Sequence, residues 1–376
     1  MDVLPAAVEG NVSRLQAQLG DVLRIENVQV LEAPDRVVSF TGELLRDADN
    51  AYETLRERFR ALGYTAHLQH RDGHEVVLAQ QGIVLAHSSR VWINIVLFAA
   101  TLLATLLTGA VNEVGQIAQD GSLIIPMLLQ RPALLLTGLP FALTLMSILL
   151  CHEMGHYIVG RRYNAPVSLP YFIPMPIAGL FGTMGAVIVQ RAPFEDRKSL
   201  FDIGVAGPLA GLVIALPLLI YGLATSTVGP IQAPAILEGN SILYLGLKFA
   251  IFGRILPSHG VDVMLSPIAW AAWGGLLITS LNLMPVGQLD GGHILYALLG
   301  KRAWPVAAGV VVLLLAMGFL WNGWFLWAVL ALLFGARHPA PLNDVSPLDA
   351  KRKLLGLGVL VLFILTFTPI PFTAIQ

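Results

Sequence analysis

The stretch that decides how this chain folds is ILLCHEMGHY, residues 148–157. It places two imidazoles and a carboxylate at the end of a long apolar run. In a helix, residues four positions apart project from one face, so His152 and His156 can hold a single zinc ion together. Glu153 then lies beside them, where it can take a proton from a water acidified by zinc and pass it to a leaving amine. This is the chemistry that the HExxH pattern indicates.

A chance match is the alternative interpretation, because short HExxH sequences also occur in helices that bind no metal. The surroundings of this match favour a site. An ionisable residue inside an apolar run costs about 3 kcal/mol or more unless it has a partner. Three such residues within five positions are hard to explain as passive structure, so we expect a metal site here.

The composition is that of a membrane protein. Of the 376 residues, 56% are hydrophobic and only 12% are charged, which does not describe a soluble globule. A net charge of −1 gives no electrostatic support for nucleic-acid binding. The single cysteine, Cys151, excludes an intramolecular disulfide and a cysteine-rich zinc cluster. We therefore expect an integral, multi-pass protein of the lipid bilayer.

Residues 1–88 differ from the rest because their composition is that of a soluble domain. Gly63 is expected to end a helix, and Arg71-Asp72-Gly73 to form the turn between the last two strands. The pattern predicts a small α+β domain without a catalytic cluster. Its expected elements are a helix at 11–19, strands at 23–31 and 37–44, a charged helix at 47–62, and strands at 65–69 and 75–79.

Residues 91–376 are predicted to form a polytopic α-helical membrane domain with about seven spanning helices. The expected spans are 91–110, 133–160, 203–222, 264–284, 303–320, 321–334 and 354–369. Lysine and arginine favour cytoplasmic loops. After Arg90, eleven of them fall on the side of the N-terminal domain and three on the other, which predicts a cytoplasmic location for residues 1–88. The HEMGH motif then lies in the cytoplasmic half of the bilayer.

Residues 171–190, YFIPMPIAGLFGTMGAVIVQ, fit no ordinary span. They are apolar enough to enter the membrane, but their prolines and glycines break a helix. Non-helical backbone at membrane depth is tolerated only where protein or a watery cavity covers it. We predict a re-entrant, β-hairpin-like loop whose strand 186–190 keeps a free edge near the metal for an unwound peptide. A loop that only packs against the bundle is the alternative.

Two other segments carry simpler signals. Residues 241–256 are amphipathic, with Lys248 and Arg254, and are predicted to lie at the outer interface of the membrane. The sequence AGPLAG, residues 206–211, has the Gly-xxx-Gly spacing that allows close helix approach, so we expect a packing role for it.

A second motif supplies the missing ligand, because a catalytic zinc normally takes three protein ligands and leaves the fourth position to water. The stretch NLMPVGQLDGGH, residues 282–293, contains one acid, Asp290, and the predicted topology returns it to the membrane half of HEMGH. His293 is a rival ligand; its other expected roles are to cap the next helix or to orient Asp290. Asn282 is a candidate to hold the oxyanion that forms when water attacks a carbonyl, with a helix-to-helix hydrogen bond as the alternative.

With these two motifs the chain resembles a known family. HEMGH in one span and NLMPVGQLDGGH in a later one are similar to the site-2 protease family of intramembrane zinc metalloproteases, and GTMGA and AGPLAG fit it too. The resemblance covers about residues 91–376. It implies a core of three helices that cleaves the transmembrane segment of single-span membrane-protein substrates after an earlier cut. The residues to which it gives roles are the ligands of one zinc ion, His152, His156 and Asp290, the general base Glu153, and the assisting Asn282.

The N-terminal module resembles that of the cyanobacterial and plastid-type branch of this family. His338-Pro339 and the expected number of spans also suit that branch, and we recognise neither a PDZ nor a CBS domain. The expected location is a prokaryotic cell membrane, and the oligomeric state stays open. A metal-binding transporter or non-catalytic receptor is the alternative function, although transporters commonly contain inverted repeats and we detect none.

Overall fold

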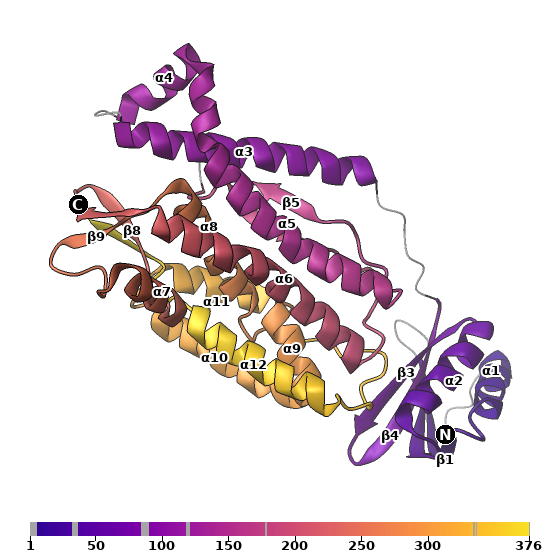
Figure 1. The fold of residues 1–376 in the computed structure, drawn as a ribbon. Helices are drawn as coiled ribbons and strands as arrows, with labels where there is room; N and C mark the ends of the chain where they lie inside the picture. Colours follow the sequence, from indigo (N-terminus) through magenta and orange to yellow (C-terminus); the bar gives the residue numbers. More distant parts are fainter. Residues whose placement is uncertain are drawn as a thin grey trace.

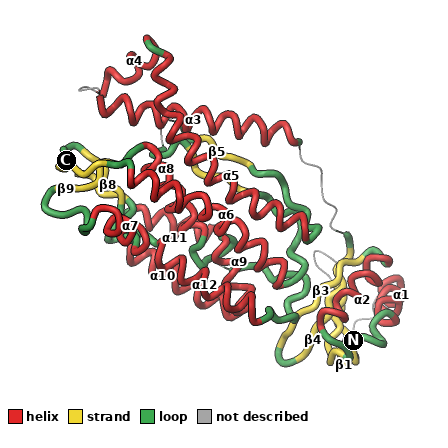
Figure 2. The backbone as a smooth tube through the Cα atoms, in the orientation of Figure 1, coloured by secondary structure: helices red, strands yellow, loops and turns green. Residues whose placement is uncertain are grey.

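The computed structural model describes residues 6–31, 37–83, 90–117, 121–176, 179–333, 335 and 337–375. A bundle of helices carries a small module of strands and helices at one end, and the C-terminus lies at the other end (Figure 1). Helices make up most of the path, while the strands gather mainly at the two ends of the bundle (Figure 2). The predicted combination of a mostly helical membrane protein with small sheets is therefore confirmed.

The N-terminal module contains two helices and a four-stranded antiparallel sheet of order β1-β2-β4-β3. The predicted elements are present, and β1 and β2 have the predicted bounds. Asp72 and Gly73 both have positive φ values, 51° and 88°, as a two-residue hairpin between β3 and β4 requires. The elements are α1 (Ala6–Ala17), β1 (Leu23–Leu31), β2 (Val37–Leu44), α2 (Ala48–Ala61), β3 (Tyr64–Arg71) and β4 (His74–Gln81).

The module has a hydrophobic core of its own between the sheet and its helices. Leu55 and Phe59 of α2 are fully buried against Phe40 and Leu68 of the sheet. The apolar residues of α2 recur three and four positions apart, so they share one face of the helix. Alternation along β2 and β3 provides the opposing apolar face.

The bundle is built from ten helices within the described residues. They are α3 (Val91–Ile117), α4 (Ile124–Gln130), α5 (Leu139–Arg162), α6 (Arg197–Ala224), α7 (Ile242–Phe252), α8 (Pro267–Asn282), α9 (Asp290–Leu299), α10 (Ala303–Met317), α11 (Gly323–Leu333) and α12 (Ala350–Thr366). Short 3₁₀ turns precede or join several of them: Gly121–Leu123, Pro132–Gly138 and Gly300–Arg302. Helix α6 occupies the centre, because it packs against α5, α8 and α9.

Four segments of the described chain are long and apolar enough to cross a membrane. They are Val91–Gln116, Pro132–Arg162, Arg197–Ala224 and Asp290–Met317. The last joins α9 to α10, so it begins well before the span that we expected at 303–320. Helices α8, α11 and α12 have 16, 11 and 17 residues. At 1.5 Å per residue α8 is about 24 Å long, less than the hydrocarbon thickness of ~30 Å, so the seven-span count stays a prediction.

The stretch that we expected to be a re-entrant loop contains a hairpin. Strand β5 (Tyr171–Pro174) pairs antiparallel with β6 (Thr183–Val187). The hairpin contacts α3 and α5, and residues 177–178 at its tip lie outside the described residues. The second strand lies three residues earlier than the predicted strand 186–190, and Gln190 forms an isolated bridge with Val167.

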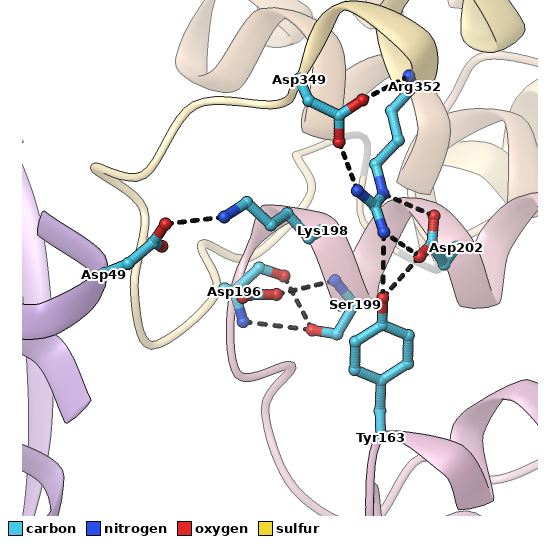
Figure 3. A network of polar contacts seen from close by, with 8 residues as sticks. All are labelled: Asp49, Tyr163, Asp196, Lys198, Ser199, Asp202, Asp349 and Arg352. Carbon is cyan, nitrogen blue, oxygen red and sulfur yellow. Dashed lines mark hydrogen bonds and ion pairs between the residues drawn. The ribbon is translucent and has the colours of Figure 1, made fainter.

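Polar contacts fix the ends of α5, α6 and α12 to one another (Figure 3). The Arg352 guanidinium on α12 donates to both carboxylate oxygens of Asp202 on α6, at 2.8 and 2.6 Å. Asp202 also accepts the hydroxyl of Tyr163, the residue after α5, at 2.5 Å. Bidentate pairs of this kind are directional, so the three helix ends keep a fixed relation.

The other end of the bundle is closed by two small sheets around a buried charge. Strand β7 (Thr227–Pro230) pairs with β9 (Val261–Met264), and β8 (Ala235–Glu238) pairs with β10 (Phe372–Ile375). Lys248 of α7 is 0% exposed, and its Nζ lies 3.4 Å from a carboxylate oxygen of Glu238 and 3.4 Å from one of Asp262. We expected an amphipathic segment at 241–256; within it Lys248 is buried, because two flanking strands supply its partners, while Arg254 is exposed.

We predict that Lys248→Met lowers the free energy of unfolding by about 3–5 kcal/mol, because it leaves two buried carboxylates without their cation. Arg254→Met is the matched control and is expected to change stability by less than about 0.5 kcal/mol, as exposed substitutions do. Thermal unfolding of the two variants in detergent measures the difference. Equal effects would contradict the role of Lys248 as the cation that holds the two sheets together.

Candidate metal centre

Helix α5 carries the HEMGH motif and turns both histidines toward α6 and α9. His152 and His156 are 3% and 5% exposed, and their ring centroids are 5.0 Å apart. The helix continues without interruption through both residues, so the i and i+4 spacing places the rings on one face, as expected from the sequence. The two imidazoles therefore point at one volume between the helices.

Asp290, the first residue of α9, brings a carboxylate to the same volume. Its Oδ2 lies 3.1 Å from His152 Nε2, and its Oδ1 lies 3.3 Å from His156 Nε2. The two Nε2 atoms are 3.3 Å apart. Ligands that are 2.0–2.1 Å from a tetrahedral zinc ion lie about 3.3 Å from one another. The spacing and the chemistry of these three donors therefore fit a zinc ion.

A backbone contact determines which ring nitrogen of His156 carries the hydrogen. Its Nδ1 lies 2.7 Å from the carbonyl oxygen of Ile203, which can only accept, so Nδ1 is the donor. In the neutral ring Nε2 then carries a lone pair and faces the oxygen of Asp290. Two acceptors at this distance repel each other unless a proton or a cation lies between them. A carbonyl that holds the outer ring nitrogen is also the usual support of a metal-binding histidine.

Glycines of α6 make room for the two rings. A Cβ on Gly207 would lie 2.0 Å from His156 Nε2, and one on Gly211 would lie 3.2 Å from Cβ of His152. From the other helix, a Cβ on Gly155 would lie 2.5 Å from the carbonyl oxygen of Ala206. The predicted packing role of AGPLAG is thus confirmed, but the sequence did not reveal that the packing partners are the two histidines themselves.

The LDGG turn places Asp290 by close backbone packing. A Cβ on Gly291 would lie 1.9 Å from the carbonyl oxygen of Leu283, and one on Gly292 would lie 2.3 Å from that of Gly287. The two glycines therefore allow close approach of the backbone. Asp290 itself opens helix α9.

The remaining candidates differ in how they relate to the three donors. Asn282 ends α8, and its amide nitrogen lies 3.3 Å from His152 Nε2. Glu153 is 4% exposed, and no hydrogen bond or salt bridge joins its carboxylate to another described residue. His293, the rival ligand, instead pairs with His338, with 2.6 Å between His293 Nδ1 and His338 Nε2. The structure therefore groups Asn282 with the donors, leaves the Glu153 carboxylate without a polar partner among the described residues, and turns His293 to another partner.

These features define a helical membrane protein with a buried His-His-Asp donor cluster. The model of Peptidase family M50 matches residues 140–322, a range that contains the three donors, Glu153 and Asn282. The chain contains a Peptidase family M50 domain, and its resemblance to the site-2 protease family is confirmed.

Curated relatives come from plants. "Probable zinc metalloprotease EGY2, chloroplastic" of Arabidopsis thaliana is 32% identical over 244 residues, which is 64% of this chain and 43% of that protein. "Probable zinc metalloprotease EGY1, chloroplastic" of Oryza sativa subsp. japonica is 32% identical over 241 residues, which is 62% of this chain and 41% of that protein. The chain thus spans well under half the length of these relatives, whose names suit the plastid-type branch. No solved structure matches the chain.

We predict that Gly207→Ala prevents metal retention, because its methyl group would occupy the position of the His156 ring. Gly358→Ala is the matched control, since a Cβ there meets no atom within 4 Å. Zinc per chain, measured by mass spectrometry after purification in detergent, is expected to fall to background in the first variant and to stay at the wild-type level in the second. Full zinc retention by Gly207→Ala would show that the α5–α6 contact does not control this centre.

Proposed function

We propose that this chain is an intramembrane zinc endopeptidase that hydrolyses peptide bonds in the transmembrane segments of single-span membrane proteins. The observation that carries this proposal is the triangle of His152, His156 and Asp290 donors, whose edges of 3.1–3.3 Å suit one zinc ion per chain. The zinc metalloprotease names of the plant relatives support the choice of metal and reaction. Four long apolar segments support the membrane setting.

The roles of the chain's own residues follow from their placement. Zinc, when bound by the three donors, would supply a Lewis acid that polarises a carbonyl and acidifies water. Glu153, which is buried and has no polar partner within the described part of the chain, takes the proton of the attacking water and delivers it to the leaving amine. Asn282 directs its amide donor to the oxygen on which negative charge develops. Ile203 keeps the His156 ring oriented through the hydrogen bond at Nδ1.

The hairpin offers a way to bind an extended substrate. Among the described residues, β6 pairs with β5 alone, so no other strand occupies its second edge, while the Thr183 hydroxyl contacts the amide and the carbonyl of Gly185. The contacts of β6 with α5, the helix that carries HEMGH, support a role of this strand near the donors. We infer that an unwound substrate segment pairs with β6 as an added strand, which exposes its peptide bonds. The hairpin is proposed to enter the bilayer as a re-entrant loop.

The membrane arrangement is also part of the proposal. We propose a cytoplasmic domain at residues 1–88 and a membrane domain at 91–376, in which α8, α11 and α12 complete seven spans in a prokaryotic cell membrane. Contacts of the module support this orientation, because it touches three stretches that all carry basic residues: the start of α6, the 3₁₀ turn before α10 and the segment before α12. Lys198 Nζ lies 2.7 Å from Asp49, and Lys301 Nζ donates to the His70 carbonyl at 3.3 Å. The amide of Leu68 donates to the Leu342 carbonyl at 2.7 Å.

Glu153→Gln is expected to keep zinc at the wild-type level and to reduce cleavage of a single-span reporter in detergent to background. The amide retains the shape of the side chain but cannot accept the proton of the attacking water. His152→Ala and Asp290→Ala are expected to lose both zinc and activity, because each removes a donor. The matched control is Glu113→Gln, a carboxylate-to-amide change on α3, which should leave both quantities unchanged.

Undiminished proteolysis in Glu153→Gln would refute the role of this residue as general base. Zinc binding by the wild type without cleavage of any single-span reporter would favour the alternative of a transporter or receptor.

Asn282→Ala is expected to lower kcat about 100-fold or more while zinc content and KM change little, because an oxyanion donor acts mainly in the transition state. Steady-state cleavage of the same reporter, together with metal analysis, measures this split. Loss of zinc or of stability with proportionate loss of activity would instead indicate that Asn282 forms a packing contact.

A further inference from the structure

The segment that connects α11 to α12 extends the sheet of the N-terminal module. The amide of Leu68 in β3 donates to the Leu342 carbonyl at 2.7 Å, and the amide of Asp344 donates back to the Leu68 carbonyl at 2.9 Å. The side chains of Leu342 and Val345 pack against the module's core. Residues 342–344 therefore form an added strand on the edge of β3, which binds the module to the membrane part of the same chain.

The same added strand has a second neighbour, the stretch that leads into α6. The amide of Leu342 donates to the Phe194 carbonyl at 2.9 Å, and the amide of Asn343 donates to the Glu195 carbonyl at 2.8 Å. Residues 342–344 thus lie between the module and the start of α6. A displacement of the module acts directly on this strand and, through it, on α6.

Asp344 joins these elements to α9 through its side chain. It is 4% exposed, and its Oδ1 accepts from Arg197 Nε at the start of α6 at 2.9 Å. Its Oδ2 accepts the hydroxyl of Tyr296 on α9 at 3.1 Å. One buried carboxylate, whose own amide is bonded to β3, therefore touches the module, α6 and α9. A buried charge with partners on several elements is costly to disturb, because loss of one side leaves the others unpaired.

Helices α6 and α9 are the ones whose relative position fixes the donor cluster. Helix α6 supplies the Ile203 carbonyl that orients His156 and the glycine surface on which both rings rest. Helix α9 begins with Asp290, six residues before Tyr296. Because a helix transmits displacement along its length, a shift of α9 at Tyr296 also moves the carboxylate of Asp290 relative to the two imidazoles.

A second contact from the connecting segment supports the same position of α9. The His338 ring stacks on Tyr296, with 4.8 Å between centroids, and its Nε2 faces His293 Nδ1 at 2.6 Å. Burial lowers the pKa of His338 to about 4, so the ring is neutral at pH 7. Its Nδ1 donates to the Pro339 carbonyl, which leaves Nε2 to accept from His293.

We propose that Asp344 is a positioning residue that holds α9 against α6 and makes the geometry of the His152, His156 and Asp290 donors depend on docking of the N-terminal module. This inference rests on the proposed function for its activity readout. It assigns to the module a role that the sequence did not indicate: the docked module keeps the donors in place, and its undocking loosens them.

The test compares Asp344→Ala and Asp344→Asn with Asp349→Asn in the full chain. Asp349 belongs to the same connecting segment and caps α12, but it contacts neither the module nor α9. Asp344→Ala is expected to weaken zinc affinity about tenfold or more, as loss of groups that support ligands does, and to lower kcat with KM within about twofold. The effects of Asp344→Asn on zinc affinity and kcat should lie between those of the wild type and Asp344→Ala. The amide has one carbonyl oxygen, so it can accept from Arg197 or from Tyr296 but cannot replace both carboxylate oxygens.

Hydrogen exchange gives a readout that is independent of zinc and of cleavage. Asp344→Ala is expected to speed amide exchange both in β3, residues 64–71, and in α9, residues 290–299, while Asp349→Asn leaves both unchanged. The proposal would be overturned if Asp344→Ala had the amide exchange, zinc affinity and kcat of the wild type. It would also be overturned if Asp349→Asn changed these quantities as much as Asp344→Ala does. If Asp344→Ala fails to fold, the same quantities are compared between Asp344→Asn and Asp349→Asn. Absence of zinc and cleavage in the wild type would refute the proposed function, while exchange would still decide the role of Asp344.

Discussion

The structure depends on three electron-rich groups held within 3.3 Å of one another in a buried place. His152, His156 and Asp290 converge on a common point, and the hydrogen bond that His156 Nδ1 donates to the Ile203 carbonyl leaves Nε2 of the neutral ring with its lone pair facing that point. Without positive charge at that point the arrangement is repulsive, and the low dielectric of the interior strengthens the repulsion. The residues around each donor nevertheless bring the three groups close together. Binding of a divalent cation among them would compensate for the repulsion.

Close approach of backbones is what the neighbouring glycines contribute. Gly207 leaves the space that the His156 ring fills, while Gly155 brings α5 against α6, and Gly291 lets α9 start against the preceding loop. The proposed hydrolysis in a membrane would need a polar pocket inside an apolar bundle, so the metal donors cannot come from a flexible surface loop. The donors come instead from helices that glycine residues allow to approach one another closely.

Much of this arrangement could be predicted because its signals are local. The i and i+4 spacing fixes the two histidines on any helix, and alternation with turn residues fixes β1, β2 and the hairpin at Asp72-Gly73. Asp290 could be predicted from the expected topology. It is the one acid of its motif, and the topology places that motif in the same half of the membrane as HEMGH. Helix lengths were less accessible: we expected a span at 303–320, but α9 already starts at Asp290, and the glycines that follow it are compatible with the first turn of a helix.

Contacts between distant segments escaped sequence analysis. The spacing of Gly207 and Gly211 indicated close packing but could not name the rings that fill the space. The burial of Lys248 was not foreseen, because its partners, Glu238 and Asp262, lie on two separate strands. Asp344 sits in an ordinary polar loop of the sequence, and only the fold shows that it meets Arg197 and Tyr296. Each of these pairings depends on tertiary geometry that no periodicity encodes.

The central claim is that one zinc ion is bound by two imidazole nitrogens and a carboxylate within the bundle. Zinc K-edge X-ray absorption of the purified full chain in detergent tests it most directly. The account predicts about four nitrogen or oxygen ligands near 2.0–2.1 Å, with scattering from two imidazoles and no sulfur. A zinc–sulfur distance of about 2.3 Å, which would implicate Cys151, or a signal without imidazole scattering would contradict it.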